Sequence, residues 1–262
     1  MKVMLITGTS SGVGFALGNY FSQKKYKVYG LSRKTPDHAL FTTIPTDITK
    51  KSEVENAVKH ILTKEKKIDV LINNAGKGMV GSIENGTEDE IIQLFHLNVI
   101  ACVHLFASVL PIMQQQNSGK IINISSIGSE MGLPFRGFYS ASKSALDKIT
   151  EAMRYELCST NIHVTSLHLG DIKTNIAESR ITSINSNFYE KSFYKVFEKI
   201  NSHVNKGVSA ESIAPFIDKL IHQKKLKAHY YFGKFGQKLS VQLKKFLPQT
   251  WFEKIIKKYS GI

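Results

Sequence analysis

Short apolar segments alternate with longer stretches of helical periodicity along the whole chain. The apolar segments have the length of buried strands, and the longer stretches place apolar residues on one face of a helix. Strands are predicted at Val3–Thr7, Lys27–Leu31, Phe41–Ile44, Ile68–Ile72, Lys120–Ile124, His163–His168 and His229–Phe232. Helices are predicted near residues 12–24, 52–65, 87–116, 138–159 and 209–222. Strands that alternate with helices favour a doubly wound parallel α/β sheet, because each crossover must be right-handed.

The boundaries of these elements carry local signals. Ser52-x-x-Glu55 and Thr87-x-x-Glu90 have the spacing of capping boxes, which predicts a helix start at each. Because no repeat or low-complexity segment interrupts the pattern, we expect one domain over residues 1–237. Residues 175–206, rich in Ser, Asn, Phe and Tyr, are too long for an ordinary connection, and this length predicts a lid.

Composition narrows the class of protein. With 262 residues and 42% hydrophobic content, the chain can bury one sizeable core. Nothing precedes the first strand and no apolar run reaches ~18 residues, so neither a signal peptide nor a membrane-spanning helix is expected. Cys102 and Cys158 lie in predicted helices, which favours buried thiols in a reducing compartment. A cytoplasmic protein is therefore expected.

The net charge of +14 is concentrated towards the C-terminus. Residues 219–262 contain eleven lysines and a single acidic residue, so this part carries +10. Within it, residues 238–262 show two short amphipathic helical patterns divided by Pro248. Two interpretations remain open: this extension packs on the domain or a second subunit, or it binds an anionic membrane surface peripherally. Nucleic acid is not an expected partner, because no recognition motif is present.

The first strand runs directly into a glycine-rich turn, Thr7-Gly8-Thr9-Ser10-Ser11-Gly12-Val13-Gly14. Glycines between an apolar strand and a helix let the backbone pass close to a bound anion, which the N–H groups at the helix start stabilise. This context predicts a pyrophosphate-binding turn. Its contacts would come from Gly8, Ser10, Ser11, Gly12, Val13 and Gly14.

A second group of candidate residues follows the fifth predicted strand. Ser126 comes just after this strand, and Tyr139 and Lys143 lie one helical turn apart at the start of the next helix. A nearby ammonium group stabilises a phenolate, so this pair suits general acid and base catalysis. Tyr20 and Tyr230 also have a lysine four residues on. Only Tyr139 follows a strand with serines at its carboxyl end, which is where ligands bind in open α/β sheets.

Taken together, these motifs resemble the short-chain dehydrogenase/reductase family. The matching motifs occur in family order over almost the whole chain: the TGxxxGxG turn at 7–14, Asp47, Asn73-Asn74-Ala75-Gly76, Asn98, Ser126, Tyr139 with Lys143, and Gly170 with Thr174. The resemblance implies a Rossmann fold whose seven predicted strands are ordered 3-2-1-4-5-6-7. The likeness extends to the branch of retinol and hydroxysteroid dehydrogenases. It implies an oxidoreductase that forms a homodimer or homotetramer.

The family's catalytic roles transfer to the matching positions. Tyr139 would exchange a proton with the reacting oxygen, and Ser126 would hold that oxygen. Lys143 would support the tyrosine and bind the nicotinamide ribose, while Asn98 would anchor a water that relays protons to the lysine. Further cofactor contacts would come from Asp47 and Ile48 at the adenine, from Asn74, Ala75 and Gly76 at the adenosine ribose, and from Gly170, Ile172 and Thr174 around the nicotinamide and diphosphate.

Two positions depart from the family's pattern. Leu169 stands where the family usually has proline before Gly170, so the turn under the nicotinamide is expected to be freer. Ser125 adjoins Ser126 and could take its role, although the spacing of thirteen residues to Tyr139 favours Ser126.

The end of the second predicted strand indicates the cofactor. An acidic residue there would accept the 2′-hydroxyl of NAD, whereas a cation would bind the 2′-phosphate of NADP. Ser32 occupies the position of the acid, and Arg33 and Lys34 follow it. NADP(H) is therefore the expected cofactor.

We therefore expect an NADPH-dependent carbonyl reductase, reversibly an alcohol dehydrogenase, for a lipophilic ketone or aldehyde of retinoid, steroid or long-chain lipid type. The aromatic residues of the segment 176–204 favour such a substrate, since an apolar lid excludes water. Alternatives are a 3-oxoacyl-carrier-protein reductase, an NADP-sensing binding protein without turnover, and a membrane scaffold. No metal is expected, because the histidines lack the spacing of a ligand set.

Overall fold

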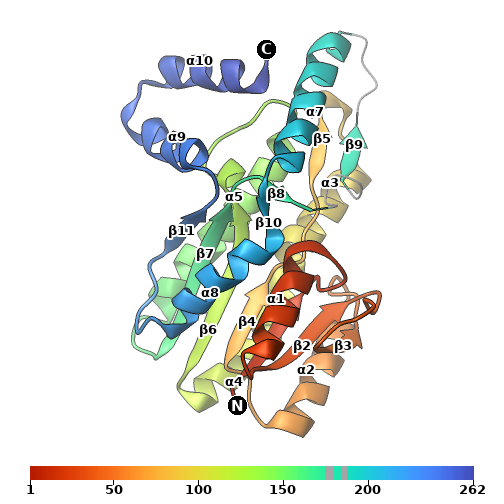
Figure 1. Cartoon of the computed structure of the whole chain (residues 1–262), viewed down its shortest axis with the longest axis vertical. Helices are drawn as coiled ribbons and strands as arrows, with labels where there is room; N and C mark the ends of the chain where they lie inside the picture. The colour runs from red at the N-terminus through yellow and green to blue at the C-terminus, as the bar shows by residue number, and fades with distance from the viewer. Residues whose placement is uncertain (175–179, 184–187) are drawn as a thin grey trace.

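A computed structural model describes residues 1–174, 180–183 and 188–262. Its centre is a parallel sheet of seven strands in the order β11-β7-β6-β4-β1-β2-β3 (Figure 1). All seven predicted strands are present, and the predicted order is confirmed. The strands are β1 (Val3–Thr7), β2 (Lys27–Ser32), β3 (Thr42–Pro45), β4 (Val70–Asn73), β6 (Gly119–Ser126), β7 (Ile162–Leu169) and β11 (His229–Phe232).

Helices cover both faces of this sheet, as a doubly wound fold requires. Val3 and Leu5 of β1 face a core formed with α2, α4 and α5, whereas Met4 and Ile6 face a core formed with α1 and α8. Successive side chains of a strand point to opposite faces, so a strand buried on both sides must be apolar throughout. The helices are α1 (Gly12–Gln23), α2 (Lys51–Glu65), α4 (Ala101–Gln116), α5 (Gly137–Glu156) and α8 (Ile213–His222).

A long helical stretch runs over Glu88–Gln116. It comprises α3 (Glu88–Phe95), the π-helical turn η2 (His96–Ile100) and α4. Its length and apolar composition would suffice to cross a bilayer. Leu105, Val109 and Met113 are nevertheless fully buried against the sheet, so this stretch is a core helix of the domain.

One predicted capping box forms and the other does not. Thr87 Oγ1 accepts the Glu90 N–H, and the Glu90 carboxylate accepts the Thr87 N–H, which confirms the start of α3. Helix α2 instead begins after Lys50, so Ser52 already lies inside the helix. The prediction at Ser52 was therefore wrong, and Glu53 carries a tertiary contact by accepting the Asp47 N–H.

Smaller elements lie at the carboxyl edge of the sheet, which is the upper end of Figure 1, away from the N-terminus. There β5 pairs with β9, and β8 pairs with β10, both in parallel. Helix α7 stands beside them. These elements are β5 (Met79–Gly81), β8 (Ile172–Lys173), β9 (Ile181–Ser183), α7 (Glu190–Asn205) and β10 (Val208–Ser209), with the 3-10 turns η1 (Ile83–Asn85), η3 (Ile127–Ser129) and η4 (Ala210–Ser212).

The segment predicted as a lid therefore contains regular structure. Phe193, Val196 and Ile200 of α7 are buried in a small core with Val80 of β5. Part of the expected lid is thus a packed helix rather than a loop. Residues 175–179 and 184–187 of the expected lid lie outside the described residues.

The basic extension forms a helical hairpin of α9 (Phe235–Phe246) and α10 (Gln249–Ser260). Pro248 lies between the two helices, as predicted. Val241, Phe252 and Ile256 are buried in a cluster with Ile127 and Met131, which follow β6. The hairpin therefore packs on the carboxyl edge of its own domain.

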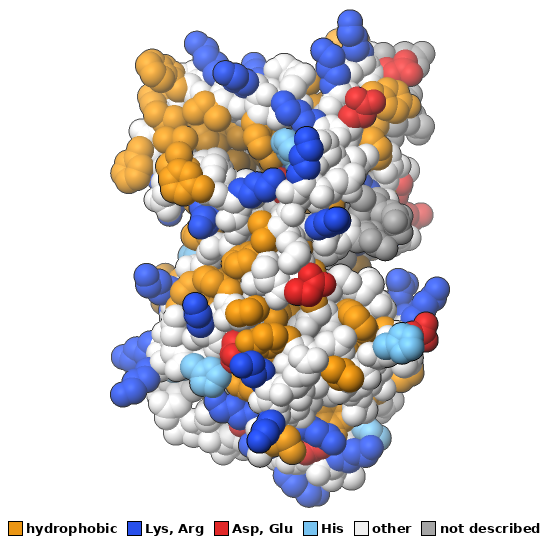
Figure 2. All heavy atoms as spheres, in the orientation of Figure 1, with side chains coloured by type: hydrophobic (Ala, Val, Ile, Leu, Met, Phe, Trp, Pro, Cys, Tyr) orange, Lys and Arg blue, Asp and Glu red, His pale blue; other side chains and the backbone are white. Residues whose placement is uncertain are grey.

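The outer side of this hairpin is apolar. In Figure 2 hydrophobic side chains gather at the upper left, where Figure 1 places α9 and α10, with lysines beside them. Phe246 is 83% exposed and Trp251 65% exposed. We call this surface the hairpin patch, and it comprises Phe235, Leu239, Phe246, Trp251 and Ile255.

The two cysteines differ in exposure. Cys102 is buried in α4, but Cys158 is exposed just beyond the end of α5. The expectation of two buried thiols was therefore wrong for Cys158, because α5 ends at Glu156 and the chain reaches the surface there.

Candidate active site

The turn after β1 is built around its glycines. Gly8 and Gly12 have φ angles of +71° and +57°, in the left-handed region that favours glycine. A Cβ on Gly14 would lie 2.3 Å from the Gly8 carbonyl oxygen and 2.6 Å from Asn74 Nδ2. The turn thus presents bare backbone at the start of α1, with Ser10 and Ser11 exposed and Val13 half-buried. This geometry fits a dinucleotide pyrophosphate.

The loop after β4 is tied to this turn by hydrogen bonds. Thr7 Oγ1 accepts the N–H groups of Asn74 and Ala75, each at 3.0 Å. Asn74 Nδ2 donates to the carbonyl oxygens of Thr7 at 2.9 Å and Gly8 at 3.3 Å. The two loops predicted to flank the cofactor are therefore held together as one unit.

At the far side of the turn, the ends of β2 and β3 bring a cation near a carboxylate. Ser32 Oγ donates to the Lys34 carbonyl oxygen at 2.7 Å, and Arg33 is exposed. Burial opposes ionisation of Asp47, but hydrogen bonds from the Thr49 hydroxyl and N–H, with the charge of Arg33, hold the Asp47 pKa below its ordinary value. The ends of β2 and β3 therefore carry a positive charge, Arg33, and a negative charge, Asp47. The adjoining Ile48 is buried in the core.

Ser126, Tyr139 and Lys143 are brought to the same edge of the sheet. Ser126 ends β6 and its Oγ accepts the Gly128 N–H at 3.0 Å, while Tyr139 and Lys143 lie in the first two turns of α5. Lys143 is 5% exposed, and its Nζ donates to the Ile124 carbonyl oxygen at 2.9 Å. The ammonium group is therefore fixed in place behind the strand end.

Asn98 lies in the π-helical turn, a feature common at functional sites. Its Oδ1 accepts the Lys77 N–H at 2.9 Å, and its Nδ2 donates to the Lys77 carbonyl oxygen and to Ser142 Oγ, each at 3.0 Å. A Cβ on Gly76 would lie 3.1 Å from Asn98 Oδ1 and 3.2 Å from Lys143 Nζ. Asn98 thus holds the loop after β4 beside the lysine.

The turn after β7 is held by β11 and by helix α9 of the C-terminal hairpin. The Gly170 N–H donates to the Phe232 carbonyl oxygen at 2.8 Å, and a Cβ on Gly170 would lie 2.2 Å from Gln237 Oε1. Further along, Ile172 is buried in β8, and the Thr174 methyl group lies 3.3 Å from where a Gly12 Cβ would be. Of the predicted contact residues of this segment, Thr174 therefore borders the glycine turn.

A buried histidine network lies directly behind Ser126. His168 Nδ1 is 3.2 Å from the Ser126 carbonyl oxygen and 3.1 Å from Ser129 Oγ, and its Nε2 is 2.9 Å from His229 Nδ1. Burial lowers the pKa of His168, although Asp147 and Glu130 act in the opposite direction. The network therefore supports the turn that carries Ser126.

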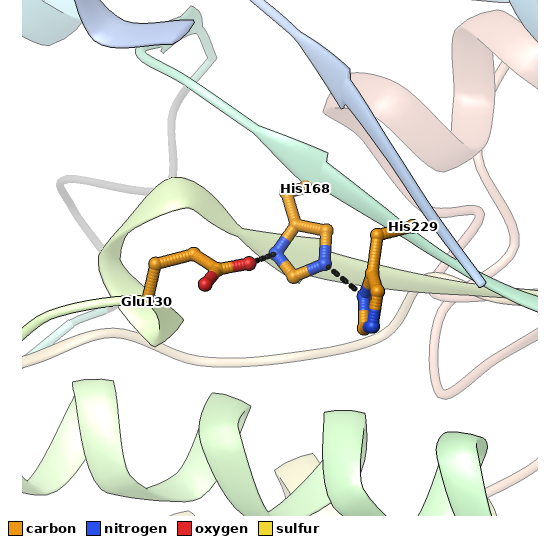
Figure 3. Close-up of side chains that lie close together, drawn as sticks. All are labelled: Glu130, His168 and His229. Carbon is orange, nitrogen blue, oxygen red and sulfur yellow. Dashed lines mark hydrogen bonds and ion pairs between the residues drawn. The ribbon is translucent and has the colours of Figure 1, made fainter. Parts of the chain in front are cut away.

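The same histidines lie near Glu130, which raises the question of a metal site. Figure 3 shows Glu130 facing Nδ1 of His168 and His229 facing Nε2, so the imidazole ring lies between them. A metal ion binds one nitrogen of a ring along its lone pair, so in this arrangement one ion would not reach all three side chains. Tyr231 also donates to Glu130 at 2.6 Å. The group is a hydrogen-bonded chain.

Several residues that shape the site were missed from the sequence. Ser142 and Lys77 hold Asn98, His168 supports the Ser126 turn, and Gln237 packs on Gly170. Thr7, whose hydroxyl holds the loop after β4, was also not assigned a role, although it stands in the predicted glycine-turn motif. The others act through contacts between residues far apart in sequence, which local patterns do not reveal.

The fold and this arrangement of loops are those of dinucleotide-dependent oxidoreductases. The family described as short chain dehydrogenase matches residues 2–185, and the chain belongs to that family. Members of this family use NAD(P)(H), and the glycine turn and its neighbouring loops fit such a cofactor.

Individual relatives agree with this assignment. A 3-ketodihydrosphingosine reductase of Bacteroides thetaiotaomicron is 33% identical over 266 aligned positions, covering 100% of this chain and 98% of the relative. An NADPH-dependent 3-dehydrocapnine reductase of Ornithobacterium rhinotracheale is 31% identical over 248 positions, covering 88% and 87%. A short-chain dehydrogenase structure from Streptomyces avermitilis has a TM-score of 0.82 at 27% identity and covers 97% of this chain and 96% of its own.

Proposed function

We propose that this oxidoreductase is an NADPH-dependent carbonyl reductase, reversibly an alcohol dehydrogenase, for lipophilic ketones or aldehydes. The observation that carries the proposal is the buried Lys143, whose Nζ donates to the Ile124 carbonyl oxygen near the end of the strand that carries Ser126, on the helix that also carries Tyr139. When bound, the nicotinamide exchanges a hydride with the carbonyl carbon.

The proton is handled by the protein's own side chains. Ser126 holds the substrate oxygen, and the Tyr139 hydroxyl donates its proton to that oxygen during reduction. The Lys143 ammonium, fixed on the Ile124 carbonyl oxygen, stabilises the phenolate that remains. Asn98 anchors a water through which the proton is replaced, and it keeps the Gly76 loop against the lysine. Reversal of these steps oxidises an alcohol.

The catalytic assignment is tested with Tyr139→Phe. The variant keeps the ring but loses the proton, so kcat is expected to fall by at least ~100-fold while NADPH binding, measured by nucleotide fluorescence, is retained. Unchanged turnover would overturn the assignment. Tight NADPH binding by the natural protein without turnover of any carbonyl would favour a sensor instead.

NADP preference is proposed from the end of β2. Ser32 leaves no carboxylate there to repel a 2′-phosphate, and Arg33 is exposed and free to reach it. Arg33→Gln is expected to raise the KM for NADPH by ~10-fold or more and to leave the KM for NADH nearly unchanged, because a charge-assisted hydrogen bond is lost. Lys59→Gln, an exposed lysine on α2, is the charge control. A natural protein that binds NADH more tightly would contradict the proposal.

A lipophilic substrate is supported by a partly apolar groove at the carboxyl edge of the sheet. The groove has a volume of about 320 Å³ and lies between α10 and the loop 131–134, which connects the segments carrying Ser126 and Tyr139. Its apolar lining comprises Met131, Leu133, Phe252, Ile256 and Ile262. The Bacteroides relative is named for a keto compound, which supports a ketone substrate.

The lipophilic assignment is tested with 2-alkanones of increasing chain length. Each added methylene that the groove buries is expected to raise kcat/KM, by up to ~4-fold. Leu133→Gln should flatten this dependence. A natural protein indifferent to chain length would contradict a lipophilic substrate, and a preference for acyl carrier protein thioesters would favour a 3-oxoacyl-carrier-protein reductase.

We further propose that the hairpin patch binds an anionic membrane at its cytoplasmic surface. Apolar side chains there can insert while the lysines of the hairpin remain at the headgroups. Phe246→Ala combined with Trp251→Ala should reduce co-sedimentation with phosphatidylglycerol vesicles, and added salt should do the same. Leu40→Ala, another exposed apolar residue, is the matched control. Equal binding by all variants would end this proposal.

A homodimer or homotetramer is proposed through α4 and α5. Val103 on α4 and Tyr155 on α5 are 42% and 77% exposed. Val103→Asp is expected to lower the molar mass measured by light scattering. If the natural protein itself has the molar mass of a monomer, the proposed assembly is wrong.

A further inference from the structure

Two arginines lie on either side of the segment that carries Tyr139. Arg136 precedes α5 as its N-cap residue, three positions before Tyr139. Arg180 immediately precedes β9, whose Ile181 packs in the same apolar cluster as Tyr139. The fold thus brings the Arg180 guanidinium close enough for the charges of both Tyr139 and Arg136 to act on it.

Arg180 is held in position by α7. Its Nη1 donates to Asn201 Oδ1 at 3.0 Å, and its guanidinium carbon lies 5.7 Å from the centre of the Phe197 ring. The side chain is half-buried. Its Cβ lies 3.4 Å from the position that a Cβ on Gly78 would occupy. These contacts restrict the guanidinium, and among residues 1–174, 180–183 and 188–262 its one hydrogen-bond acceptor is Asn201.

The charges of this pair are not balanced by a carboxylate in the described part of the chain. Neither arginine forms a salt bridge there, and Arg136 Nε is buried without a hydrogen-bond partner. Burial, followed by the positive charge of Arg136, lowers the pKa of Arg180, and Tyr139 acts in the opposite direction. The nearby Asp171 carboxylate is already bound by Gln237 Nε2 at 2.5 Å.

Two partly buried guanidinium groups that no carboxylate of the described residues pairs are costly unless an anion joins them. Guanidinium forks bind planar or tetrahedral oxyanions through paired hydrogen bonds. We propose that Arg180 and Arg136 bind an anionic group on the substrate, a carboxylate, sulfonate or phosphate, close to the carbonyl that is reduced at Tyr139. This inference rests on the proposed function and narrows its substrate to lipophilic ketones that carry such a group.

The test uses two ketones that differ in one charge, 2-oxodecane-1-sulfonate and decan-2-one. With NADPH, the natural protein is expected to have a kcat/KM at least ~10-fold higher for the sulfonate, and Arg180→Gln should lower the ratio of the two kcat/KM values by ~10-fold or more. Arg180→Lys should lose less than Arg180→Gln, because it retains the charge but not the fork. Lys195→Gln removes an exposed positive charge from α7 and should leave the ratio unchanged.

A ratio near one for the natural protein, or a ratio that Arg180→Gln does not change, would overturn the inference. Failure of both ketones to oxidise NADPH would count against the proposed function. In that case the affinities of the NADP-bound protein for decane-1-sulfonate and decan-1-ol, measured by calorimetry, test the anion site independently of turnover. Weaker sulfonate binding in Arg180→Gln, with decan-1-ol binding less affected, supports the site, and equal sulfonate binding to both proteins overturns it.

Discussion

Gln237 Oε1 accepts the backbone N–H of Asp171 at 3.3 Å, and its Nε2 donates to the Asp171 carboxylate at 2.5 Å. The same Oε1 lies 2.2 Å from where a Cβ on Gly170 would be, so a side chain at this position would displace the Gln237 amide. The family's proline is replaced here by Leu169, which leaves the turn without a fixed φ angle. Helix α9 therefore restrains from outside a turn that the local sequence leaves free.

If the turn at Gly170 contacts the cofactor as predicted, the Gln237 contact should influence cofactor binding. We expect Gln237→Ala to raise the KM for NADPH by about fivefold, the effect of losing a hydrogen bond that restrains the turn. Steady-state titration of NADPH measures it. Gln242→Ala, an exposed residue on the same helix, is the control and should leave the KM unchanged. An unaltered KM in Gln237→Ala would show that the turn is rigid without the hairpin.

The glycine turn gives a second prediction. Gly14→Ala places a Cβ 2.3 Å from the Gly8 carbonyl oxygen, and neither backbone segment can rotate away. NADPH binding should weaken by more than ~10-fold, and the melting temperature should fall. Nucleotide fluorescence and thermal unfolding measure the two effects. Gly236→Ala on α9, where nothing lies within 4 Å, should keep NADPH binding and raise stability by up to ~1 kcal/mol. Normal NADPH binding by Gly14→Ala would contradict the close packing.

The histidine network behind Ser126 predicts how stability depends on pH. Burial lowers the pKa of His168 below its ordinary value of 6.5, so the unfolded chain binds this proton more readily than the folded one. The stability that neutral His168 contributes is present above pH 6.5 and is lost as the pH falls through the lower folded pKa. Urea midpoints should therefore decrease on acidification.

Substitution isolates the contribution of His168. His168→Asn should reduce the slope of the urea midpoint against pH, whatever its effect at pH 7. His163 and His203 also have lowered pKa values, so a smaller slope should remain. His60→Gln, an exposed residue, should keep the slope of the natural protein. Equal slopes in His168→Asn and the natural protein would exclude this role.

The cysteines predict a simple chemical difference. Burial raises the pKa of Cys102 to about 11, despite the opposing charge of Lys143, whereas Cys158 is exposed. Ellman's reagent should modify one thiol in the folded protein and the second only after unfolding. Cys158→Ser should abolish the reaction of the folded protein, and a fast reaction in this variant would show that α4 opens readily.

Much of the fold could be predicted because its signals are local. Strands buried on both faces must be apolar throughout, so β1, β4 and β6 are readable as short runs. The turn at Gly8–Gly14 is readable because positive φ angles and close backbone contacts require glycine at fixed positions. The capping prediction failed at Ser52, because α2 already begins at Lys51 and Glu55 pairs with Lys51 instead.

The sequence by itself determined the strands of the sheet and the glycine turn, because hydrophobic period and glycine geometry depend on neighbours along the chain. The strand order was implied by the resemblance to a known family, and the sheet confirms it. Only the tertiary structure decided that part of the expected lid is a packed helix, that α10 buries Phe252 on the domain, and that Ile181, the neighbour of Arg180, packs with Tyr139. These relationships join residues separated by long stretches of chain. Their free energy comes from surfaces that exist only once the sheet has formed.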